Sequence, residues 1–377
     1  MIDKQEVGKR IAALRGGLGC SQAKLADLIG VSGQAVSKWE KGVTLPDAEL
    51  LLTLSWLGNT TINGILEGDG FAAAGAGADR GLVRASALLH CPTCGERLRV
   101  PTAGVEMPRL VCANGHGVEV IDGVVAFPAR EIEGELWSLW LKNYDQYLRE
   151  QHAPESPRYT QGEVYYKEAL WREVEVLRPR VILDVACGMG TGIQYIIERI
   201  RWPVTVILAD LSHRILKYDR VYFTQEKHNP FVDMVYLACD CAALPLGDST
   251  VDVVFSNMGF ESLQRKMMDG FREAFRVLKP GGHAVYNRHL LDDHRGENGK
   301  RWTNLLFAAD DRLEGMLGDT LQDMEQWTAT CERVGFRPSR ATQIYGDLPA
   351  PDEDVFPYEN MVLRWMGQWV LVSAKPR

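Results

Sequence analysis

Two pairs of potential metal ligands lie close together in the chain. Cys91 and Cys94 are separated by two residues, and Cys112 and His116 by three. Two thiolates on one tight turn, with a thiolate and an imidazole on a second turn, supply the four ligands of a tetrahedral zinc site. Because all four positions would be filled by protein, the site is expected to be structural. One alternative is a group of reduced thiols beside an unrelated histidine. Another is a metal site in which His90 is the histidine ligand.

A second chemical signal is a glycine-rich turn that follows an acid at the end of an apolar run. The order is Val181-Ile182-Leu183-Asp184, then Gly188, Gly190 and Gly192. Isoleucines then recur at helical spacing over residues 193–200. A strand, a glycine turn and a helix form the first unit of a nucleotide-binding sheet, since glycine lets the backbone approach a ligand closely.

Further acids end the next apolar segments. The run at 204–209 ends in Asp210, and the run at 234–239 ends in Asp240. An acid at the end of the second strand can accept hydrogen bonds from both ribose hydroxyls. A fourth run, 251–256, ends in Asn257. We expect a fifth strand at 283–289, a helix at 326–334, and two antiparallel strands at 336–344 and 369–374.

These residues resemble the class I S-adenosylmethionine (SAM)-dependent methyltransferases over residues 144–377. The Leu278-Lys279-Pro280-Gly281-Gly282 turn belongs to the same pattern. The resemblance implies that the glycine turn holds the methionine part of SAM, that Asp210 binds the ribose, and that Asp240 with Cys241 faces the adenine. The implied cofactor-binding set is Asp184, Ala186, Cys187, Gly188, Gly190, Gly192, Asp210, Leu211, Asp240, Cys241 and Asn257.

A dinucleotide dehydrogenase is the main rival interpretation. Its Gly-x-Gly-x-x-Gly fingerprint starts directly at the strand end, whereas an acid precedes the turn here. The segment after the fourth strand resembles the quinone-biosynthesis type and related small-molecule methyltransferases. It lacks the prolines that base-amino methyltransferases carry beside Asn257 and Phe260. No catalytic residue is assigned, because methyl transfer needs mainly orientation and desolvation.

The first 67 residues predict a helical DNA-binding domain. One helix follows Ser21 and closes on Gly30, and a second follows Ser32. This pattern resembles the phage-repressor-like (XRE-type) helix-turn-helix family, whose second helix enters the major groove. By position, the residues that would face DNA are Gln22, Ser32, Gly33, Gln34, Ser37 and Lys38. Seven basic side chains are matched by seven acidic ones, so a docking or dimerisation domain that has lost DNA remains the alternative.

The chain is therefore expected to be a multidomain protein with an all-α domain, a small zinc ribbon and an α/β Rossmann-like domain. The expected boundaries are 1–67 for the helix-turn-helix domain, 68–87 for a flexible linker, 88–130 for the ribbon, 131–180 for a helical cap and 181–377 for the methyltransferase domain. The ribbon resembles the leader of 23S ribosomal RNA guanine-N1 methyltransferases. We expect it to unfold alone if zinc is lost.

The net charge and the distribution of apolar residues limit the kinds of binding partner and the cell compartment that we expect for this protein. Net charge is −8, which disfavours an overall electrostatic grip on nucleic acid but leaves room for a local patch. No apolar run approaches the roughly 20 residues that span a bilayer, and the N-terminus has no apolar signal core, so we expect a cytoplasmic protein without a membrane partner. Eight cysteines in that compartment indicate metal binding or buried thiols.

The leading functional hypothesis is a SAM-dependent methyltransferase with a small-molecule acceptor, a DNA-binding module and a structural zinc ion. A homodimer is the oligomeric state that a two-fold DNA site would favour. Two alternatives stay open. One is a ribosomal RNA methyltransferase, which the ribbon favours. The other is a transcription regulator that uses the methyltransferase fold as a ligand sensor.

Overall fold

The structure is a computed structural model that describes residues 2–58, 60–68, 80–100, 109–127, 161–223, 228–263, 266–290, 322–345 and 367–377. Residues 131–160 of the expected cap lie outside the described residues. Within the described ranges, no helix has both the length and the apolarity that a membrane crossing requires.

The N-terminal domain is a bundle of short helices. They are α1 (Lys4–Gly17), α2 (Gln22–Ile29), α3 (Gly33–Glu40), α4 (Ala48–Leu57) and α5 (Ile62–Glu67). Side-chain oxygens of Ser21 and Ser32 accept hydrogen bonds from the first turns of α2 and α3, and Gly30 ends α2 with φ 70°. Val36 and Trp39 of α3 are buried against α1 and α2. The helix-turn-helix predicted from the two serine caps and Gly30 is confirmed.

The described strands, all of which follow the N-terminal domain, form one mixed sheet in the order β1-β2-β3-β6-β5-β4-β7-β8-β10-β9. Their bounds are β1 (Arg109–Val111), β2 (Gly117–Ile121), β3 (Val124–Ala126), β4 (Val181–Val185), β5 (Val204–Asp210), β6 (Val232–Ala238), β7 (Val251–Asn257), β8 (Leu278–Leu290), β9 (Arg337–Tyr345) and β10 (Gly367–Ala374). Strands β3 to β8 pair in parallel, and β9 and β10 pair antiparallel. The Rossmann-like class with a terminal antiparallel pair is confirmed.

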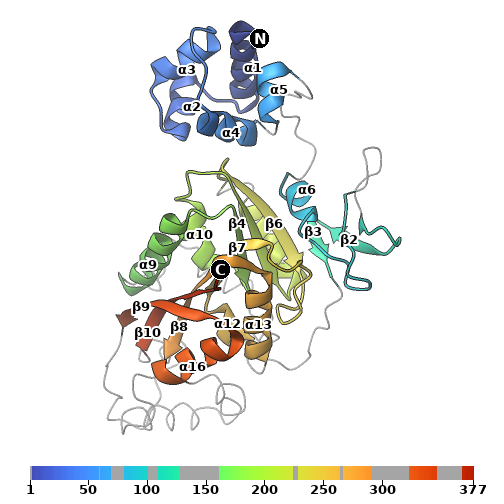
Figure 1. The fold of residues 1–377 in the computed structure, drawn as a ribbon, viewed down its shortest axis with the longest axis vertical. Coiled ribbons are helices and arrows are strands. Elements are labelled where there is room, and N and C mark those ends of the chain that lie inside the picture. The colour runs from blue at the N-terminus through green and yellow to red at the C-terminus, as the bar shows by residue number, and fades with distance from the viewer. Residues whose placement is uncertain are drawn as a thin grey trace.

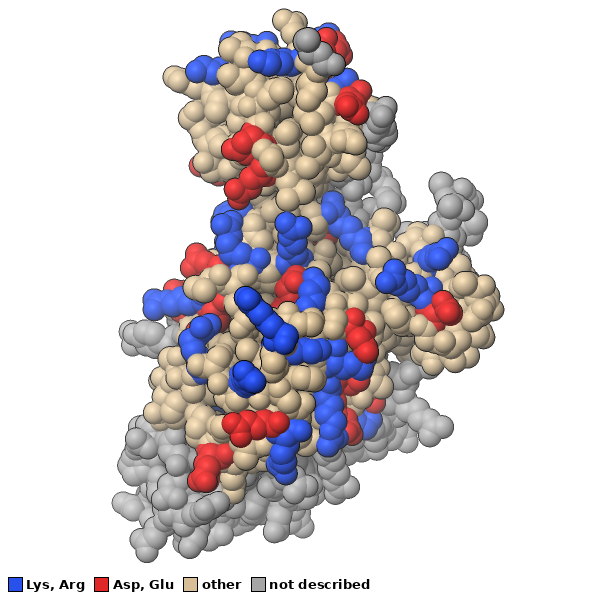
Figure 2. Space-filling model, viewed as in Figure 1, with Lys and Arg blue, Asp and Glu red and all other residues tan. Residues whose placement is uncertain are grey.

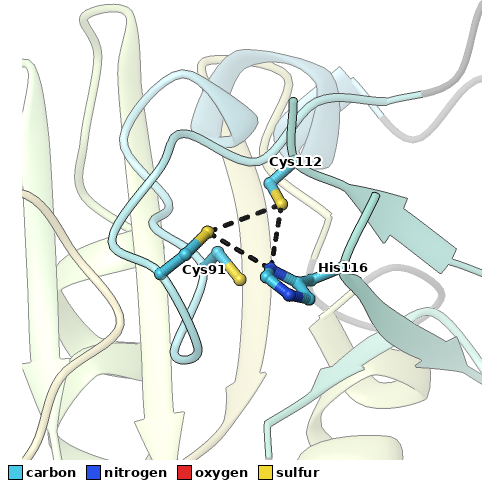
Figure 3. Close-up of side chains that lie close together, drawn as sticks. Cys91, Cys112 and His116 are labelled. Atoms are coloured by element: carbon cyan, nitrogen blue, oxygen red, sulfur yellow. Dashed lines mark hydrogen bonds between the residues drawn. The ribbon is translucent and has the colours of Figure 1, made fainter. Parts of the chain in front are cut away.

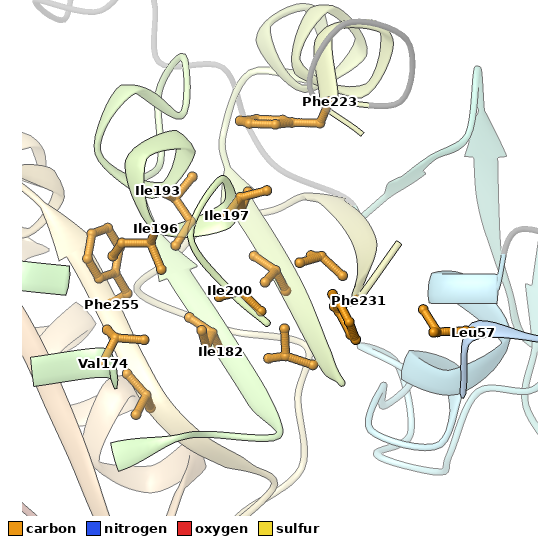
Figure 4. Packing of buried hydrophobic residues seen from close by; sticks show 14 of the residues in the cluster. Leu57, Val174, Ile182, Ile193, Ile196, Ile197, Ile200, Phe223, Phe231 and Phe255 are labelled. Carbon is orange, nitrogen blue, oxygen red and sulfur yellow. The ribbon is translucent and has the colours of Figure 1, made fainter. Parts of the chain in front are cut away.

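Helices cover both faces of this sheet (Figure 1). They are α6 (Arg80–Ser86), α9 (Gln161–Leu177), α10 (Thr191–Ile197), α11 (His213–Val221), α12 (Gly259–Ser262), α13 (Met267–Val277) and α16 (Met324–Val334). Successive strand residues point to opposite faces. Ile182 accordingly joins the core formed with α9 and α10 (Figure 4), while Leu183 joins the core formed with α6, α13 and α16.

Two segments differ from the sequence expectation. Residues 80–86, expected to be part of a flexible linker, form α6 and pack on β6, where a Cβ on Gly81 would lie 2.0 Å from the Met234 carbonyl oxygen. The Leu278–Gly282 turn is part of β8, although the pairing register shifts there, with Val251 opposite Leu278 and Val253 opposite His283. Apolar packing of α6 and strand pairing along β8 override the local Gly and Pro signals.

The ribbon is continuous with the sheet of the Rossmann-like domain. Strand β3 pairs with β6, with Val125 opposite Leu237, and the Phe127 N–H donates to the Ala238 carbonyl at 2.9 Å. Lys217 of α11 also forms an ion pair of 2.6 Å with Asp122 in the β2–β3 turn. The ribbon therefore extends the edge of the sheet and holds α11.

The helix-turn-helix domain lies at the amino ends of the parallel strands. Leu57 of α4 belongs to the same buried cluster as Phe231, which directly precedes β6 (Figure 4). The Arg84 guanidinium of α6 lies 3.5 Å from the centre of the Trp56 ring of α4. The opposite, carboxyl edge of the strands is therefore clear of this domain (Figure 1).

Candidate functional site

The glycine-rich turn connects the carboxyl end of β4 to α10. Ala186, Gly188 and Gly190 have φ of 50°, 53° and 61°, in the left-handed region where glycine is favoured. Ala186 adopts this conformation in spite of its Cβ, a sign of backbone strain at the turn. A Cβ on Gly192 would lie 2.4 Å from Asn257, so glycine is needed there for α10 to approach β7.

Three buried carboxyl groups lie next to this turn. Asp184 is at the end of β4, Asp210 at the end of β5 and Asp219 on α11. The Asp210 carboxylate accepts the Gly188 and Ser212 N–H groups, each at 2.9 Å. Among the described residues, Asp184 Oδ1 and both Asp219 oxygens have no hydrogen-bond partner.

Burial sets the protonation of these acids. It raises the pKa of Asp184 and of Asp219 well above the usual range, and the nearby Asp210 charge raises both further. Burial also raises the pKa of Asp210, although its backbone donors act in the opposite direction. Desolvation disfavours the charged form of each acid, so a cationic ligand in contact with these carboxyl groups would stabilise their ionised forms.

The other predicted cofactor residues lie at the same carboxyl edge. Asp240 accepts the Ala242 N–H at 2.9 Å and Lys266 Nζ at 2.8 Å, so its carboxylate is ion-paired. The Cys241 thiol is buried and donates to the Ala209 carbonyl at 3.6 Å. Leu211 follows Asp210 and is half-buried. The structure thus places the predicted cofactor-binding residues along one edge of the sheet, with the Asp240 carboxylate ion-paired to Lys266.

The half-buried Cys187 thiol lies within the turn itself. It donates to the Gly188 carbonyl at 3.5 Å, and burial raises its pKa well above the ordinary value, with Asp210 adding to the effect. Cys187 is therefore a neutral thiol here and lines the turn without offering a reactive thiolate.

Sequence reasoning missed two polar residues near this edge, Asn287 and Asp219. Asn287 of β8 lies in register with Asn257 of β7; its Oδ1 accepts the Met258 N–H at 2.9 Å. Asn257 Oδ1 and Asn287 Nδ2 have no partner among the described residues, which leaves an acceptor and a donor at the strand ends. Asp219 could have been found, because it falls on the apolar face of α11, four residues after Ile215.

The predicted metal ligands converge (Figure 3). Their ligand atoms all lie within 4.8 Å of one another. Cys94 Sγ is 3.7 Å from Cys112 Sγ and 3.3 Å from His116 Nδ1, and Cys112 Sγ is 3.6 Å from the same nitrogen. Zinc–sulfur bonds of about 2.3 Å in a tetrahedron imply sulfur separations of about 3.8 Å. Cys91 would supply the fourth ligand, so the donor set fits a tetrahedral zinc ion.

The predicted DNA-facing residues lie on and beside α3. Gly33, Gln34 and Lys38 are exposed, whereas Ser37 is partly buried. Ser32 caps α3 through its side chain, which accepts the Ala35 N–H at 3.2 Å.

Gln22, predicted to touch phosphate, is already engaged in this structure. Its amide donates to Glu40 at 2.7 Å, and the same carboxylate accepts Arg15 at 2.6 Å. Its contact with a phosphate would need this hydrogen bond to be exchanged.

The comparisons with known proteins agree with this arrangement. The model of the "Methyltransferase domain" family matches residues 182–282, and that of the "Helix-turn-helix" family matches residues 11–65. A malonyl-acyl-carrier-protein O-methyltransferase of Marinomonas sp. is 31% identical over 125 residues, 33% of this chain and 43% of that protein. A ubiquinone/menaquinone biosynthesis C-methyltransferase of Hydrogenovibrio crunogenus is 32% identical over 121 residues, 31% of this chain and 46% of that protein.

The chain thus spans less than half the length of these curated relatives. Among solved structures, a methyltransferase described as putative, from Bacillus halodurans, aligns with a TM-score of 0.41 and 16% identity over 56% of this chain and 100% of its own. The two matched families fall on the helical bundle and on the sheet that carries the glycine turn. The chain therefore joins a helix-turn-helix domain to a domain of the methyltransferase family.

Proposed function

We propose that the protein is a SAM-dependent methyltransferase for a small-molecule acceptor, with a structural zinc ion and a DNA-binding N-terminal domain. The observation that carries the proposal is the group of buried acids around the glycine turn. Asp184 Oδ1 has no partner, and Asp210 keeps lone pairs beyond its two backbone donors. When bound, SAM supplies an electrophilic methyl group on a sulfonium cation.

The chain's own residues would then act by binding and orientation. Asp210 would accept hydrogen bonds from the ribose hydroxyls, and Asp184 would offer its unpartnered oxygen to a cationic donor. Asn257 and Asn287 supply an acceptor and a donor at the strand ends that could orient the methyl acceptor. Holding acceptor and donor in line supplies most of what methyl transfer needs.

The small-molecule acceptor is supported by the relatives. The names of the two curated relatives refer to a malonyl group on acyl-carrier protein and to quinone biosynthesis. The missing prolines beside Asn257 argue in the same direction.

DNA binding is supported by the exposed Gln34 and Lys38 on α3, at positions that read the major groove in helix-turn-helix proteins. A homodimer would suit a two-fold DNA site. Zinc is supported by the tetrahedral fit of the Cys91, Cys94, Cys112 and His116 donors.

The test starts with calorimetry of SAM binding to the full chain. Asp210→Asn should weaken binding by about 1–3 kcal/mol, because one carboxylate oxygen becomes an NH2 group that cannot accept a hydrogen bond from the ribose. Asp269→Asn, an exposed acid on α13, is the matched control and should bind normally. Absence of SAM binding by the wild type would contradict the proposal.

Turnover is then measured with methyl-labelled SAM and fractionated cell extract. Label should enter a small-molecule fraction that resists nuclease. Label in RNA would support the ribosomal RNA alternative, and tight SAM binding without any labelled product would support a ligand sensor.

A further inference from the structure

Four arginines gather at the amino ends of β4 and β5, on the edge opposite the glycine turn. They are Arg178, Arg180, Arg199 and Arg201. The loops that carry them are joined by a hydrogen bond of 2.9 Å from the Trp202 indole N–H to the Pro179 carbonyl. We call these four residues the arginine patch.

Aromatic rings and carbonyl groups position the patch. The Arg178 guanidinium lies 5.4 Å from the centre of the Trp202 ring, and that of Arg199 lies 3.3 Å from the centre of the Tyr195 ring. Arg201 donates to the carbonyl of Ile200 at 2.8 Å. Such contacts hold a guanidinium in place without neutralising its charge.

The charges of three of the four arginines in the patch are not cancelled locally. In the part of the chain that the structure describes, no ion pair is recorded for Arg178, Arg180 or Arg201, and all three are exposed with the N-terminal domain in place. The neighbouring Asp252 carboxylate accepts the backbone N–H of Arg180 and forms an ion pair with Lys279 at 2.7 Å. A net positive surface therefore remains on a protein whose total charge is −8.

The patch adjoins the helix-turn-helix domain. The Phe231 carbonyl accepts the Val204 N–H at 3.0 Å, so the loop before β6 lies next to the loop that carries Arg201. Phe231 also belongs to the buried cluster that contains Leu57 of α4. Figure 2 shows Lys and Arg side chains gathered on the methyltransferase domain directly below the N-terminal domain.

Part of the positive charge of the N-terminal domain is engaged in ion pairs within that domain. Arg15 is paired with Glu40 at 2.6 Å, and Lys9 with Glu6 at 2.7 Å. Since neutralised phosphates supply much of the affinity for duplex DNA, a helix-turn-helix domain of this kind benefits from cations outside it.

We propose that the arginine patch binds the phosphate backbone of the duplex held by α3, next to the sequence that α3 reads. This inference rests on the proposed DNA binding and adds a second, sequence-independent contact on the methyltransferase domain. Each phosphate neutralised by the patch should steepen the fall of affinity with salt by about 0.9 in log–log slope.

The experiment uses the full chain and two duplexes from selection on random DNA. One covers only the selected site, and the other extends it by about 20 base pairs, two helical turns, on both sides. The patch variant carries Arg178→Gln, Arg180→Gln and Arg201→Gln. The matched control carries Arg272→Gln, Arg333→Gln and Arg337→Gln, which remove the same charge from exposed positions on α13, α16 and β9.

The wild type and the control should bind the long duplex at least tenfold more tightly than the short one. The patch variant should lose that gain, and its salt slope on the long duplex should fall by about 2–3. An unchanged gain in the patch variant, or patch-dependent binding only to single-stranded RNA or to anionic vesicles, would overturn the inference.

The variant Gln34→Ala in α3 separates two proposals, sequence-specific DNA binding by α3 and binding of the DNA backbone by the arginine patch. If Gln34→Ala abolishes sequence preference while the patch variant binds normally, DNA reading by α3 stands and the patch inference fails. If the patch variant weakens binding while Gln34→Ala changes nothing, the patch holds DNA without a reading helix. No binding of either duplex by the wild type at low salt would overturn both.

Discussion

Loss of the zinc site should destabilise the methyltransferase sheet as well as the ribbon. The perturbation is Cys112→Ser, which removes one of four ligands. A ribbon this small depends on its metal for folding. Because β3 pairs with β6, unfolding of the ribbon would remove the edge strand from the sheet. This prediction differs from the sequence expectation, in which the ribbon unfolds alone.

The magnitude follows from the side chains that the ribbon covers. Leu237 of β6 is fully buried and lies opposite Val125, and Leu246 is 2% exposed and bridges to Leu89. Exposing a leucine costs about 1.5–3 kcal/mol, as an upper estimate. With partial relaxation we expect the methyltransferase domain to lose about 2–4 kcal/mol. For a domain of this size, that lowers Tm by about 4–16 °C.

The assay is thermal unfolding of the full chain, with zinc content measured in the same samples. Hydrogen exchange of the β6 amides reports on the sheet separately from the ribbon. Cys20→Ser, at a half-buried thiol of the N-terminal domain, is the matched control and should keep its zinc and its protection. Zinc-free Cys112→Ser protein with unchanged β6 protection and unchanged Tm would refute the reasoning.

Three further outcomes are expected. Gln34→Ala should weaken binding to the selected DNA site by about 1–3 kcal/mol and leave binding to random DNA unchanged, measured by fluorescence anisotropy. The free energy of unfolding of the wild type should decrease as pH rises from about 4, because burial raises the pKa of Asp219 and the folded state keeps this proton to a higher pH than the unfolded state. Asp219→Asn should lessen that decrease, as measured by urea titrations at several pH values. Asn287→Ala should leave SAM affinity within about threefold but lower turnover, since its unpartnered Nδ2 lies on the strand beside Asn257, where we propose that the acceptor is oriented.

The sequence predicted the elements whose signals are local. Serine caps and Gly30 define α2 and α3, and the apolar runs that end in Asp210 and Asn257 became β5 and β7. The Cys and His spacing also predicted a cluster that the structure brings together. These features are determined by residues that lie near one another along the chain, so they can be predicted from a single sequence.

Features that depend on tertiary contacts could not be predicted. The Gly- and Ala-rich stretch indicated a linker through residue 87, but apolar packing of Leu82 and Ala85 against β6 makes residues 80–86 a helix. Nothing in residues 124–126 indicates that they pair with a strand more than a hundred residues later. Asn287 was missed for the same reason, since its importance comes from lying in register with Asn257.

The two ligand sites lie at opposite ends of the parallel strands, and this limits how strongly they can influence each other. SAM would bind at the carboxyl edge near Asp210, whereas the N-terminal domain contacts the amino edge at Phe231 through Leu57. Coupling needs an element with two arrangements that both ligands bias, and the buried strands β4 to β6 are a rigid connection. We therefore expect SAM to change DNA affinity by less than about fivefold, below the usual range of allosteric coupling. DNA titrations with and without SAM measure this directly, and a change of a hundredfold would show that the contact of α4 with the amino edge is a switch.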